Sequence, residues 1–297
     1  MTHGKTLVLG STGFLGGYFL NNLGHSADGH TSNSVSRQNI GSNDYVVKYI
    51  RNTEDVKRLL GESEYSRIIN CIAMSDIDDC ESNPEQANWL NTELPRILAQ
   101  ECKTIEAQLI HISTDAVFSS QEPFATEDMN PNPISVYGKT KYKGEIAVLE
   151  EDEKSLVCRV NFFGWNSRGK SLFNYFYSNI KASKKIVGFD DIFFTPLYAR
   201  DTVDCIIELA EQNKSGLFHV VGNERISKFE FGKIIAEEMN SYTNLIERGS
   251  FLNSDIASTR TADLSLSNVK IKGEGIKIPT TVSGIKELLK EVRSKHE

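Results

Sequence analysis

The side chains best suited to acid–base chemistry in this sequence are a tyrosine and the lysine that follows it. Tyr137 and Lys141 stand four positions apart in SVYGKTKYKGE, and this spacing places both on one face of a helix. An unperturbed phenol titrates at about pH 10, and a neighbouring ammonium favours the phenolate, so we expect Lys141 to lower the pKa of Tyr137. Tyr137 would then donate a proton to a carbonyl oxygen while a hydride reaches the carbonyl carbon. Alone, the spacing is weak evidence, because many surface helices carry both residue types.

A hydroxyl-bearing segment precedes this pair. Ser113 and Thr114 end the strand predicted in AQLIHISTDAVF, and open α/β sheets bind their ligands at the carboxyl ends of their strands. A hydroxyl there can polarise a carbonyl group and stabilise the negative charge that develops on its oxygen. Serine and threonine at a strand end also act as caps or turn formers, so the neighbouring motifs decide between the two roles.

Three glycines near the N-terminus supply a further motif. Gly10, Gly13 and Gly16 lie between a short apolar run and a predicted helix in LVLGSTGFLGG. A helix N-terminus offers N–H groups and a positive dipole end, and glycine lets the backbone turn sharply and phosphates approach. The position at the start of a strand–helix series favours a dinucleotide pyrophosphate over a glycine-rich turn without a ligand. Together with the hydroxyl and the Tyr–Lys pair, the loop predicts a dinucleotide-dependent active site.

The stretch NSVSRQN, in which we expect the second strand, bears on the choice of cofactor. An acidic residue at the end of that strand normally binds a ribose 2′-OH and selects NAD. Here the stretch holds no Asp or Glu and carries Ser36 and Arg37 instead. A guanidinium suits a 2′-phosphate, so we predict NADP(H) as the preferred cofactor. NAD(H) stays open, because single surface arginines are common.

Apolar runs alternate with helical patterns along the chain. The alternation predicts an α/β fold, a doubly wound parallel sheet of the NAD(P)-binding Rossmann type. Thr53 is the predicted N-cap of the helix in TEDVKRLLGE. We expect residues 1–158 to form the NADP(H)-binding domain. Residues 159–297 would form mainly a smaller substrate-binding region that returns strands to the main sheet. The expected strands lie in KTLVLG, YVVKYI, RIINCIAM, AQLIHISTDAVF, KSLVCRV and GLFHVVG.

Composition narrows the class of protein. A net charge of −7 over 297 residues argues against a general nucleic-acid or anionic-membrane binder. The first residues, MTHGKTLVLG, lack the apolar core of a secretory signal, and no stretch approaches the roughly 20 apolar residues of a membrane span. We therefore expect a cytoplasmic protein. Five widely spaced cysteines without a CxxC pair suit reduced thiols better than disulfides or a zinc site; they are Cys71, Cys80, Cys102, Cys158 and Cys205.

With these motifs in view, the chain resembles the extended short-chain dehydrogenases/reductases, and within them the dTDP-4-dehydrorhamnose reductase (RmlD-like) family. The segments that carry the resemblance are GSTGFLGG, NCIAMSDIDDCESNPEQANWLN, STDAVF and VYGKTKYKGE. It covers the first 145 residues well and the remainder loosely. It implies that Thr114 is the catalytic hydroxyl, Tyr137 the acid and Lys141 its partner. The implied pyrophosphate cradle is Gly10, Thr12, Gly13, Phe14 and Leu15, and the implied ribose-lining residues are Asn70, Cys71, Ile72 and Ala73.

The sequence also departs from the family pattern. Ala116 stands where the family usually has Tyr, and FFTPLYARD replaces its Gly-x-Pro-Thr segment. RVNFFG instead resembles a segment of broader nucleotide-sugar epimerases, in which the Asn lies near the sugar nucleotide. We therefore nominate Asn161 for substrate contact and Arg260 for the substrate diphosphate. A lone arginine is more often a solvated surface residue.

The resemblance and the residues together predict an NADPH-dependent reductase of a 4-keto nucleotide-linked deoxysugar. Two alternatives stay open: a nucleotide-sugar epimerase, which the lack of an acidic residue after the second strand disfavours, and a non-catalytic dinucleotide-binding subunit similar to the methionine adenosyltransferase beta subunit. The expected partner is a nucleotide sugar. Members of the family are often homodimers, so a homodimer is open here. A magnesium requirement is also open, since the sequence singles out no carboxylates for the ion.

Overall fold

The computed structural model of the chain describes residues 5–31, 45–47, 50–61, 64–119, 122–166, 169–251 and 261–294. Its backbone contacts divide the chain into two compact units. The first consists of Met1–Val117, Ser135–Arg159 and Ile206–Phe218, and the second of Phe118–Ile134, Val160–Cys205 and His219–Glu297. Compared with the predicted domain 1–158, the first unit leaves out 118–134 and takes in 206–218. The domain boundary at residue 158 stays a prediction.

A seven-stranded sheet is built by the described residues, in the order β11-β6-β5-β4-β1-β2-β3. Every neighbour from β5 to β3 pairs in parallel. The order reverses between β1 and β4, and ligands of doubly wound sheets bind at such a switch point. The predicted doubly wound α/β fold is therefore confirmed. The strands are β1 (Lys5–Leu9), β2 (Ala27–Thr31), β3 (Tyr45–Val47), β4 (Tyr65–Asn70), β5 (Gln108–Thr114), β6 (Leu156–Val160) and β11 (Gly216–Val220).

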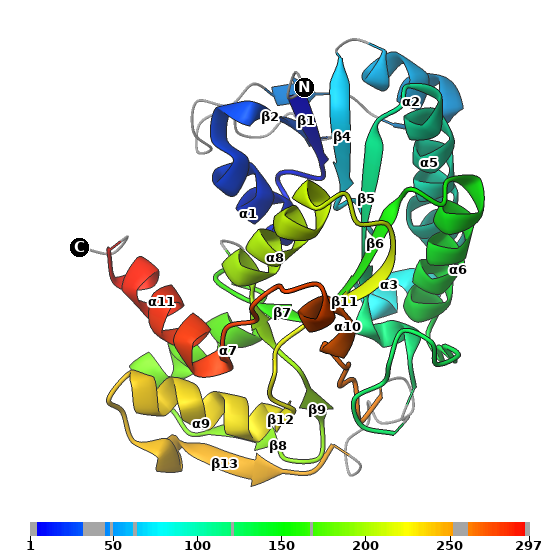
Figure 1. Cartoon of the computed structure of the whole chain (residues 1–297). Coiled ribbons are helices and arrows are strands. Elements are labelled where there is room, and N and C mark those ends of the chain that lie inside the picture. The colour runs from blue at the N-terminus through cyan, green and yellow to red at the C-terminus, as the bar shows by residue number, and fades with distance from the viewer. Residues whose placement is uncertain are drawn as a thin grey trace. The chain divides into compact units, whose positions relative to one another are not determined.

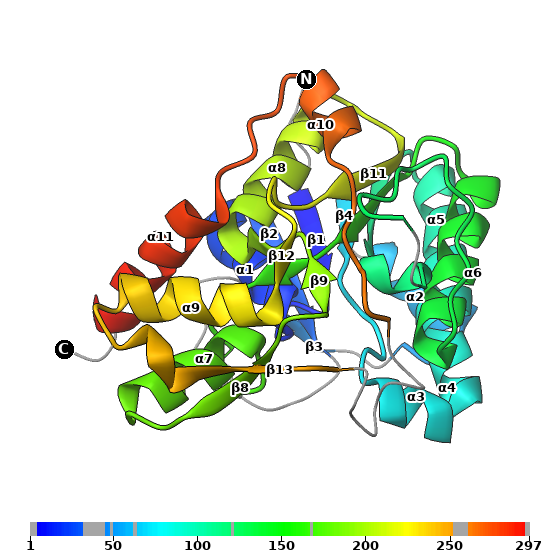
Figure 2. The same cartoon turned by 90° about the horizontal axis from the view of Figure 1, so that it is seen from below.

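Helices of the first unit cover both faces of this sheet. Figures 1 and 2 show α2 (Thr53–Leu60), α5 (Leu94–Thr104) and α6 (Val136–Glu151) together on one face and α1 (Phe14–Leu23) on the other. Leu7 and Leu9 of β1 point to the face of α2 and α5, where they are completely buried in one apolar cluster with residues of both helices. Their two-residue spacing is the period of a strand, which is why this short segment can support a helix layer.

The connection between β4 and α5 contains a π-helical turn. It runs from α3 (Ile77–Ser82) through α4 (Pro84–Asn88) to the π turn Trp89–Glu93, which continues directly into α5. Pro95 is the second residue of α5 and has no N–H to donate back into the preceding turn, and the π turn lies immediately before α5. The chain from Pro84 to Thr104 is therefore helical throughout, as α4, the π turn and α5 in direct succession.

One local prediction is wrong, and another lies outside the described residues. The second described strand is Ala27–Thr31, and the stretch NSVSRQ, for which the sequence predicts a strand, falls outside the described residues. Asn52, not Thr53, is the N-cap of α2, because the Asn52 side chain accepts a hydrogen bond from the Asp55 N–H at 3.0 Å.

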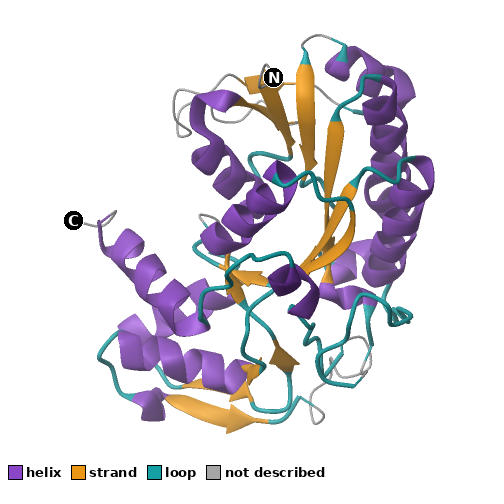
Figure 3. Ribbon diagram, in the orientation of Figure 1, coloured by secondary structure: helices purple, strands orange, loops and turns teal. Residues whose placement is uncertain are grey.

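The second unit contains shorter strands, which pair two by two: β7 with β10, β9 with β12, and β8 with β13. Figure 3 shows α9 lying along the β8–β13 pair. Two elements, α8 and β11, begin in one unit and end in the other. None of the described helices has the length and apolar character needed to cross a bilayer. The elements not yet given are β7 (Phe162–Phe163), α7 (Leu172–Lys181), β8 (Ile186–Phe189), β9 (Phe193–Phe194), β10 (Leu197–Tyr198), α8 (Ala199–Glu211), β12 (Ile226–Ser227), α9 (Lys228–Glu238), β13 (Ile246–Gly249), α10 (Val269–Gly273), α11 (Thr281–Ser294) and the 3-10 turns Gly24–Ser26, Asp115–Val117 and Thr243–Leu245.

Candidate active site

The loop between β1 and α1 can be built only with glycine at two of its positions. Gly10 has φ +74°, and a Cβ on it would lie 3.0 Å from the carbonyl carbon of Cys71. A Cβ on Gly16 would lie 2.3 Å from the carbonyl oxygen of Gly10. By contrast, a Cβ on Gly17 would meet the Ser11 carbonyl oxygen at an ordinary 3.6 Å. The loop is thus pressed against both its own helix and the segment after β4.

The N-terminus of α1 is open to an anion. Its N-cap, Gly13, is exposed and makes no side-chain capping bond, and its first turn holds no acidic residue. N–H groups and the positive dipole end are therefore not neutralised by a side chain within the helix. Ser11 is occupied otherwise: its N–H and hydroxyl both donate to the carbonyl oxygen of His30, at 3.1 and 2.9 Å. A loop of this shape fits a dinucleotide pyrophosphate.

The other residues predicted for the cradle lie beside this N-terminus. Thr12 and Phe14 are half-buried, and Leu15 is buried, so Leu15 could contribute only its backbone. After β4, the backbone N–H of Cys71 donates to the Leu9 carbonyl oxygen at 3.0 Å, which holds the predicted ribose-lining segment against the end of β1. Cys71 and Ile72 are half-buried and Ala73 is exposed, whereas Asn70 is fully buried.

One acidic residue does lie in the second strand, but away from the carboxyl ends. Asp28 pairs in register with Leu7 of β1. Its carboxylate is 2.5 Å from the ammonium of Lys5 and accepts a hydrogen bond from the Tyr65 hydroxyl at 3.0 Å. These partners occupy Asp28 inside the fold, so it is no ribose ligand. Ser36 and Arg37 lie outside the described residues, and the preference for NADP(H) over NAD(H) stays a prediction.

Thr114 and Tyr137 meet where β5 ends and α6 begins. The Thr114 hydroxyl donates to a carboxylate oxygen of Asp115 at 3.0 Å and accepts from the Ala116 N–H at 3.2 Å. Burial raises the pKa of Tyr137 to about 12, and a hydrogen bond with Thr114 acts weakly in the opposite direction. The expectation that the phenol pKa is lowered is therefore wrong, because desolvation dominates. Tyr137 is a neutral phenol at physiological pH, the form that can donate a proton.

Lys141 lies one helical turn after Tyr137 on α6 and is 1% exposed. Its Nζ donates to the carbonyl oxygen of Ile112 at 2.6 Å and is 3.3 Å from Nε2 of His111. Burial lowers the pKa of Lys141 to about 8, with Glu145 and then Cys71 acting in the opposite direction. The side chain of Lys141 therefore changes charge close to neutral pH.

A buried ion pair joins Glu145, one turn after Lys141 on α6, to Arg159 of β6. Glu145 accepts hydrogen bonds from Nε of Arg159 at 3.0 and 3.2 Å and from Nη2 at 2.7 Å, and both side chains are about 2–3% exposed. The Ser113 hydroxyl donates to the same carboxylate at 2.5 Å. Ser113 is thus used inside the fold, which leaves Thr114 as the hydroxyl at the strand end.

With this geometry established, the chain can be compared with known proteins. Residues 4–294 match the RmlD substrate binding domain family. The chain belongs to this family. A probable low-salt glycan biosynthesis reductase of Haloferax volcanii is 34% identical over 74% of the chain and 76% of its own length. The methionine adenosyltransferase 2 subunit beta of Mus musculus is 30% identical over 96% of the chain and 87% of its own length.

Solved structures agree on the architecture of this RmlD-family chain. The dTDP-4-dehydrorhamnose reductase of Bacillus anthracis, in complex with NADP, aligns with a TM-score of 0.84 at 24% identity over 98% of the chain and all of that structure. The NAD(P)-binding Rossmann fold predicted for the chain is thereby confirmed. The family assignment also confirms the predicted enzyme class at the level of the family, an NAD(P)-dependent oxidoreductase.

Sequence reasoning missed two residues that organise this RmlD-family site. Asn91, in the π turn, accepts a hydrogen bond from the Met74 N–H at 2.9 Å and donates to the Met74 carbonyl oxygen at 3.0 Å. It also donates to the Thr140 hydroxyl at 3.1 Å. Asn91 thus connects the segment after β4 to α6. Asn91 is the last residue of the segment NCIAMSDIDDCESNPEQANWLN, which carries the family resemblance, but the sequence assigned it no role. The second residue is His111, which lies within the apolar strand β5, and no motif in the sequence marked it as part of a site.

The two residues nominated for the substrate lie outside the described part of the unit that holds this site. Asn161 belongs to the second unit, where its carbonyl oxygen accepts from the Leu197 N–H at 3.0 Å. Arg260 lies outside the described residues. Both stay predictions.

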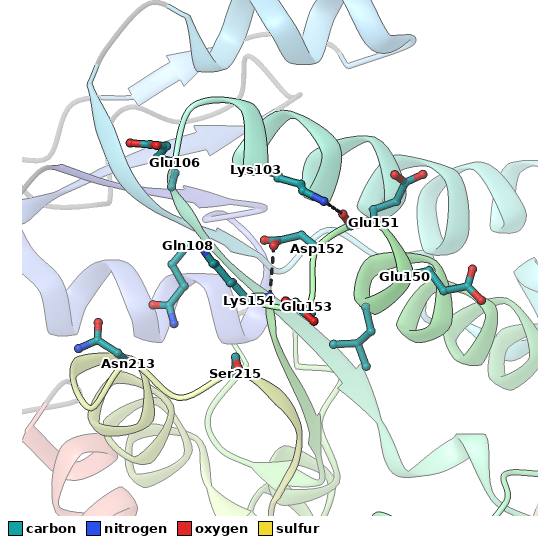
Figure 4. Close-up of a pocket in the computed structure, with 12 residues that line it drawn as sticks. Lys103, Glu106, Gln108, Glu150, Glu151, Asp152, Glu153, Lys154, Asn213 and Ser215 are labelled. Carbon is teal, nitrogen blue, oxygen red and sulfur yellow. Dashed lines mark hydrogen bonds between the residues drawn. The ribbon is translucent and has the colours of Figure 1, made fainter.

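A cavity of about 800 Å³ in the first unit lies at the opposite edge of the sheet (Figure 4). Its walls include Gln108, the first residue of β5, and the residues just before β6 and β11. None of the predicted site residues lines it. Its charged residues are Glu106, Glu150, Glu151, Asp152, Glu153, Lys103 and Lys154. It is therefore separate from the candidate active site, which uses the carboxyl ends of the strands.

Proposed function

We propose that this chain uses NADPH to reduce the 4-keto group of a nucleotide-linked deoxysugar. The observation that carries the proposal is the hydrogen bond between Tyr137 and Thr114 at the carboxyl end of β5, with Lys141 one helical turn further along α6. All three belong to the unit that holds the glycine loop. A proton donor, a strand-end hydroxyl and a buried amine are what carbonyl reduction requires of a protein.

Each of these residues has a distinct task. Tyr137, a neutral phenol because of its raised pKa, donates its proton to the carbonyl oxygen of the sugar. Thr114, which contacts Tyr137, holds that oxygen in place. Lys141 lies on the same helix face and supports Tyr137 and the ribose of the cofactor. When bound, the reduced nicotinamide supplies the hydride.

The residues proposed to hold the cofactor surround the switch point between β1 and β4. Gly10 and Gly16 keep the loop close, and the N-terminus of α1 faces the pyrophosphate. NADP(H) is proposed over NAD(H) on the strength of Ser36 and Arg37, and the NADP complex of the Bacillus anthracis reductase supports that choice. The full proposed set is Gly10, Thr12, Gly13, Phe14, Leu15, Ser36, Arg37, Asn70, Cys71, Ile72, Ala73, Tyr137 and Lys141, with Asn161 and Arg260 for the nucleotide sugar.

The test follows nicotinamide absorbance with a dTDP-4-keto-6-deoxysugar and either NADPH or NADH. We expect consumption that favours NADPH and that falls by roughly 10²–10⁴ in Tyr137→Phe, the usual contribution of a positioned proton donor. Tyr142→Phe, on the same helix and half-buried, is the matched control and keeps full activity. Equal loss in both variants would contradict the role of Tyr137.

A non-catalytic role is the second candidate, because the beta subunit of mouse methionine adenosyltransferase 2 aligns with 96% of the chain. It predicts tight cofactor binding with no consumption on any nucleotide keto-sugar. An epimerase would instead interconvert two nucleotide sugars with no net consumption of cofactor. Chromatography of the sugar products therefore separates all three outcomes. A homodimer and a magnesium requirement are read out in the same preparation, by light scattering and by chelation.

A further inference from the structure

The side chain of Asn70 is held in one orientation at the end of β4. Its Oδ1 accepts a hydrogen bond from the Ile72 backbone N–H at 3.1 Å, and a backbone N–H can only donate. The amide Nδ2 therefore faces the opposite side, where it lies 3.2 Å from Nδ1 of His111. The sheet register places Asn70 directly beside His111, and both are completely buried. Nδ1 of His111 must accept a hydrogen bond here.

The tautomer of His111 follows from that bond. Burial, with a contribution from Lys141, lowers the pKa of His111 well below 6.5, so the ring is neutral at physiological pH. A neutral imidazole carries one proton, and with Nδ1 accepting, that proton is on Nε2. Nε2 lies 3.3 Å from Nζ of Lys141. The N–H of the ring is therefore presented to the lysine.

An ammonium group cannot accept a hydrogen bond from the Nε2–H of His111, since it has three donors and no acceptor. A neutral amine can accept from Nε2–H and still donate to the Ile112 carbonyl oxygen at 2.6 Å. We propose that Asn70 and His111 are positioning residues that favour the neutral amine form of Lys141, through a chain of hydrogen bonds that starts at the Ile72 N–H. The chain acts on Lys141 without either residue touching a substrate.

Other groups that face Lys141 oppose these hydrogen bonds by favouring the ammonium form of the lysine. Glu145, one turn further along α6, favours the ammonium, although its charge is shared with Arg159 at 2.7 Å. Cys71, from the segment after β4, acts in the same direction more weakly. Burial and the His111 donor favour the amine. Because the opposing effects leave the pKa of Lys141 at about 8, a change in one hydrogen bond is enough to shift the charge state of the lysine.

The meaning of this arrangement for catalysis rests on the proposed function, in which Lys141 supports Tyr137. With a pKa of about 8, Lys141 loses its positive charge as the pH rises through about 8 instead of remaining charged to about pH 10.4. Asn70 and His111, which set this pH range, are completely buried and act through Lys141.

The first test reads the tautomer directly in the full-length protein. Nitrogen NMR of protein labelled with ¹⁵N-histidine distinguishes a protonated from an unprotonated ring nitrogen, and the His111 signals are assigned by their loss in His111→Phe. We expect an unprotonated Nδ1 and a protonated Nε2 across neutral pH. A proton on Nδ1 overturns the proposal, and no variant needs to fold for the wild-type spectrum to be decisive, since the six histidines can also be assigned through the backbone.

The second test reverses the direction of the hydrogen bond between residue 70 and His111. Asn70→Asp keeps an oxygen for the Ile72 N–H but turns the other atom from donor to acceptor, so Nε2 becomes an acceptor for the ammonium. Asn70→Leu removes the amide donor without adding a charge. We expect Lys141 to bind its proton about tenfold more tightly in both variants, a shift of one pKa unit. Carbon NMR of labelled lysine, with Lys141→Met for assignment, measures it.

An unchanged titration of Lys141 in Asn70→Leu overturns the proposal, because a rise in Asn70→Asp alone would reflect only the added charge. Neither NMR readout needs turnover. Failure of the reductase assay with the expected tautomer and titration therefore rejects the proposed function alone. Reductase activity without the expected tautomer or titration rejects only the role of Asn70 and His111.

Discussion

Removing the carboxylate of Glu145 should strongly destabilise the first unit, because it strands the buried charge of Arg159. Glu145→Ala leaves the guanidinium of Arg159, which is 2% exposed, without its hydrogen bonds of 2.7 to 3.2 Å to this carboxylate. It also leaves the hydroxyl of Ser113 without its acceptor. An uncompensated buried charge costs about 3–5 kcal/mol, whereas apolar replacement of both partners is close to neutral. We therefore expect Glu145→Ala to lose about 3–5 kcal/mol and Glu145→Leu/Arg159→Met to recover most of it.

Urea unfolding of the three proteins, followed by circular dichroism, measures these differences from the midpoints and slopes. Ile146→Ala is the control, since Ile146 is the next residue on α6 and is 40% exposed. The reasoning fails if Glu145→Ala loses less than about 1 kcal/mol, the range of an exposed ion pair. It also fails if the double variant is as unstable as the single one, because the cost would then come from lost packing and not from the stranded charge.

Three further outcomes are expected. Gly16→Ala should weaken NADPH binding by about tenfold in a fluorescence titration, because its Cβ would lie 2.3 Å from a backbone oxygen, while Gly17→Ala, with 3.6 Å of room, should bind normally. The free energy of unfolding should rise with pH between about 8 and 10.5, because Lys141 has a lowered pKa and the unfolded chain binds the extra proton in that window; Lys141→Met should lack this part of the slope when denaturation is measured across it. Asn52→Ala should lower the free energy of unfolding by about 1 kcal/mol in calorimetry. Thr53→Ala should leave it unchanged, since Asn52, not Thr53, caps α2.

The parts of the molecule that the sequence predicts well are those encoded by neighbouring residues. The glycine loop follows an apolar strand and opens a helix, so its place at the end of β1 needs no knowledge of distant contacts. The same holds for Tyr137 and Lys141, whose spacing alone puts them on one helix face. Local patterns of this kind gave both the sheet and the position of the site.

Features that depend on pairing across the sheet could not be predicted. β2 contains Asp28 and His30, and its buried polar residues hide the strand from any apolar pattern. The tie between Asn70 and His111 exists only because β4 and β5 pair in that register. The pKa of Tyr137 moved opposite to expectation because burial, which no spacing reveals, outweighs its neighbours.

The seven-stranded sheet is completed late in the life of the nascent chain. β6 (Leu156–Val160) is buried at every residue, yet its outer neighbour, β11, begins only at Gly216. At about 5–20 residues per second, a ribosome needs several seconds to make the intervening stretch. During that time β6 would present an apolar edge with unpaired backbone groups, which is a template for unwanted strand pairing. Translation speed between these two strands, and chaperones that shield the edge, should therefore govern how much of this protein a cell recovers in its native form.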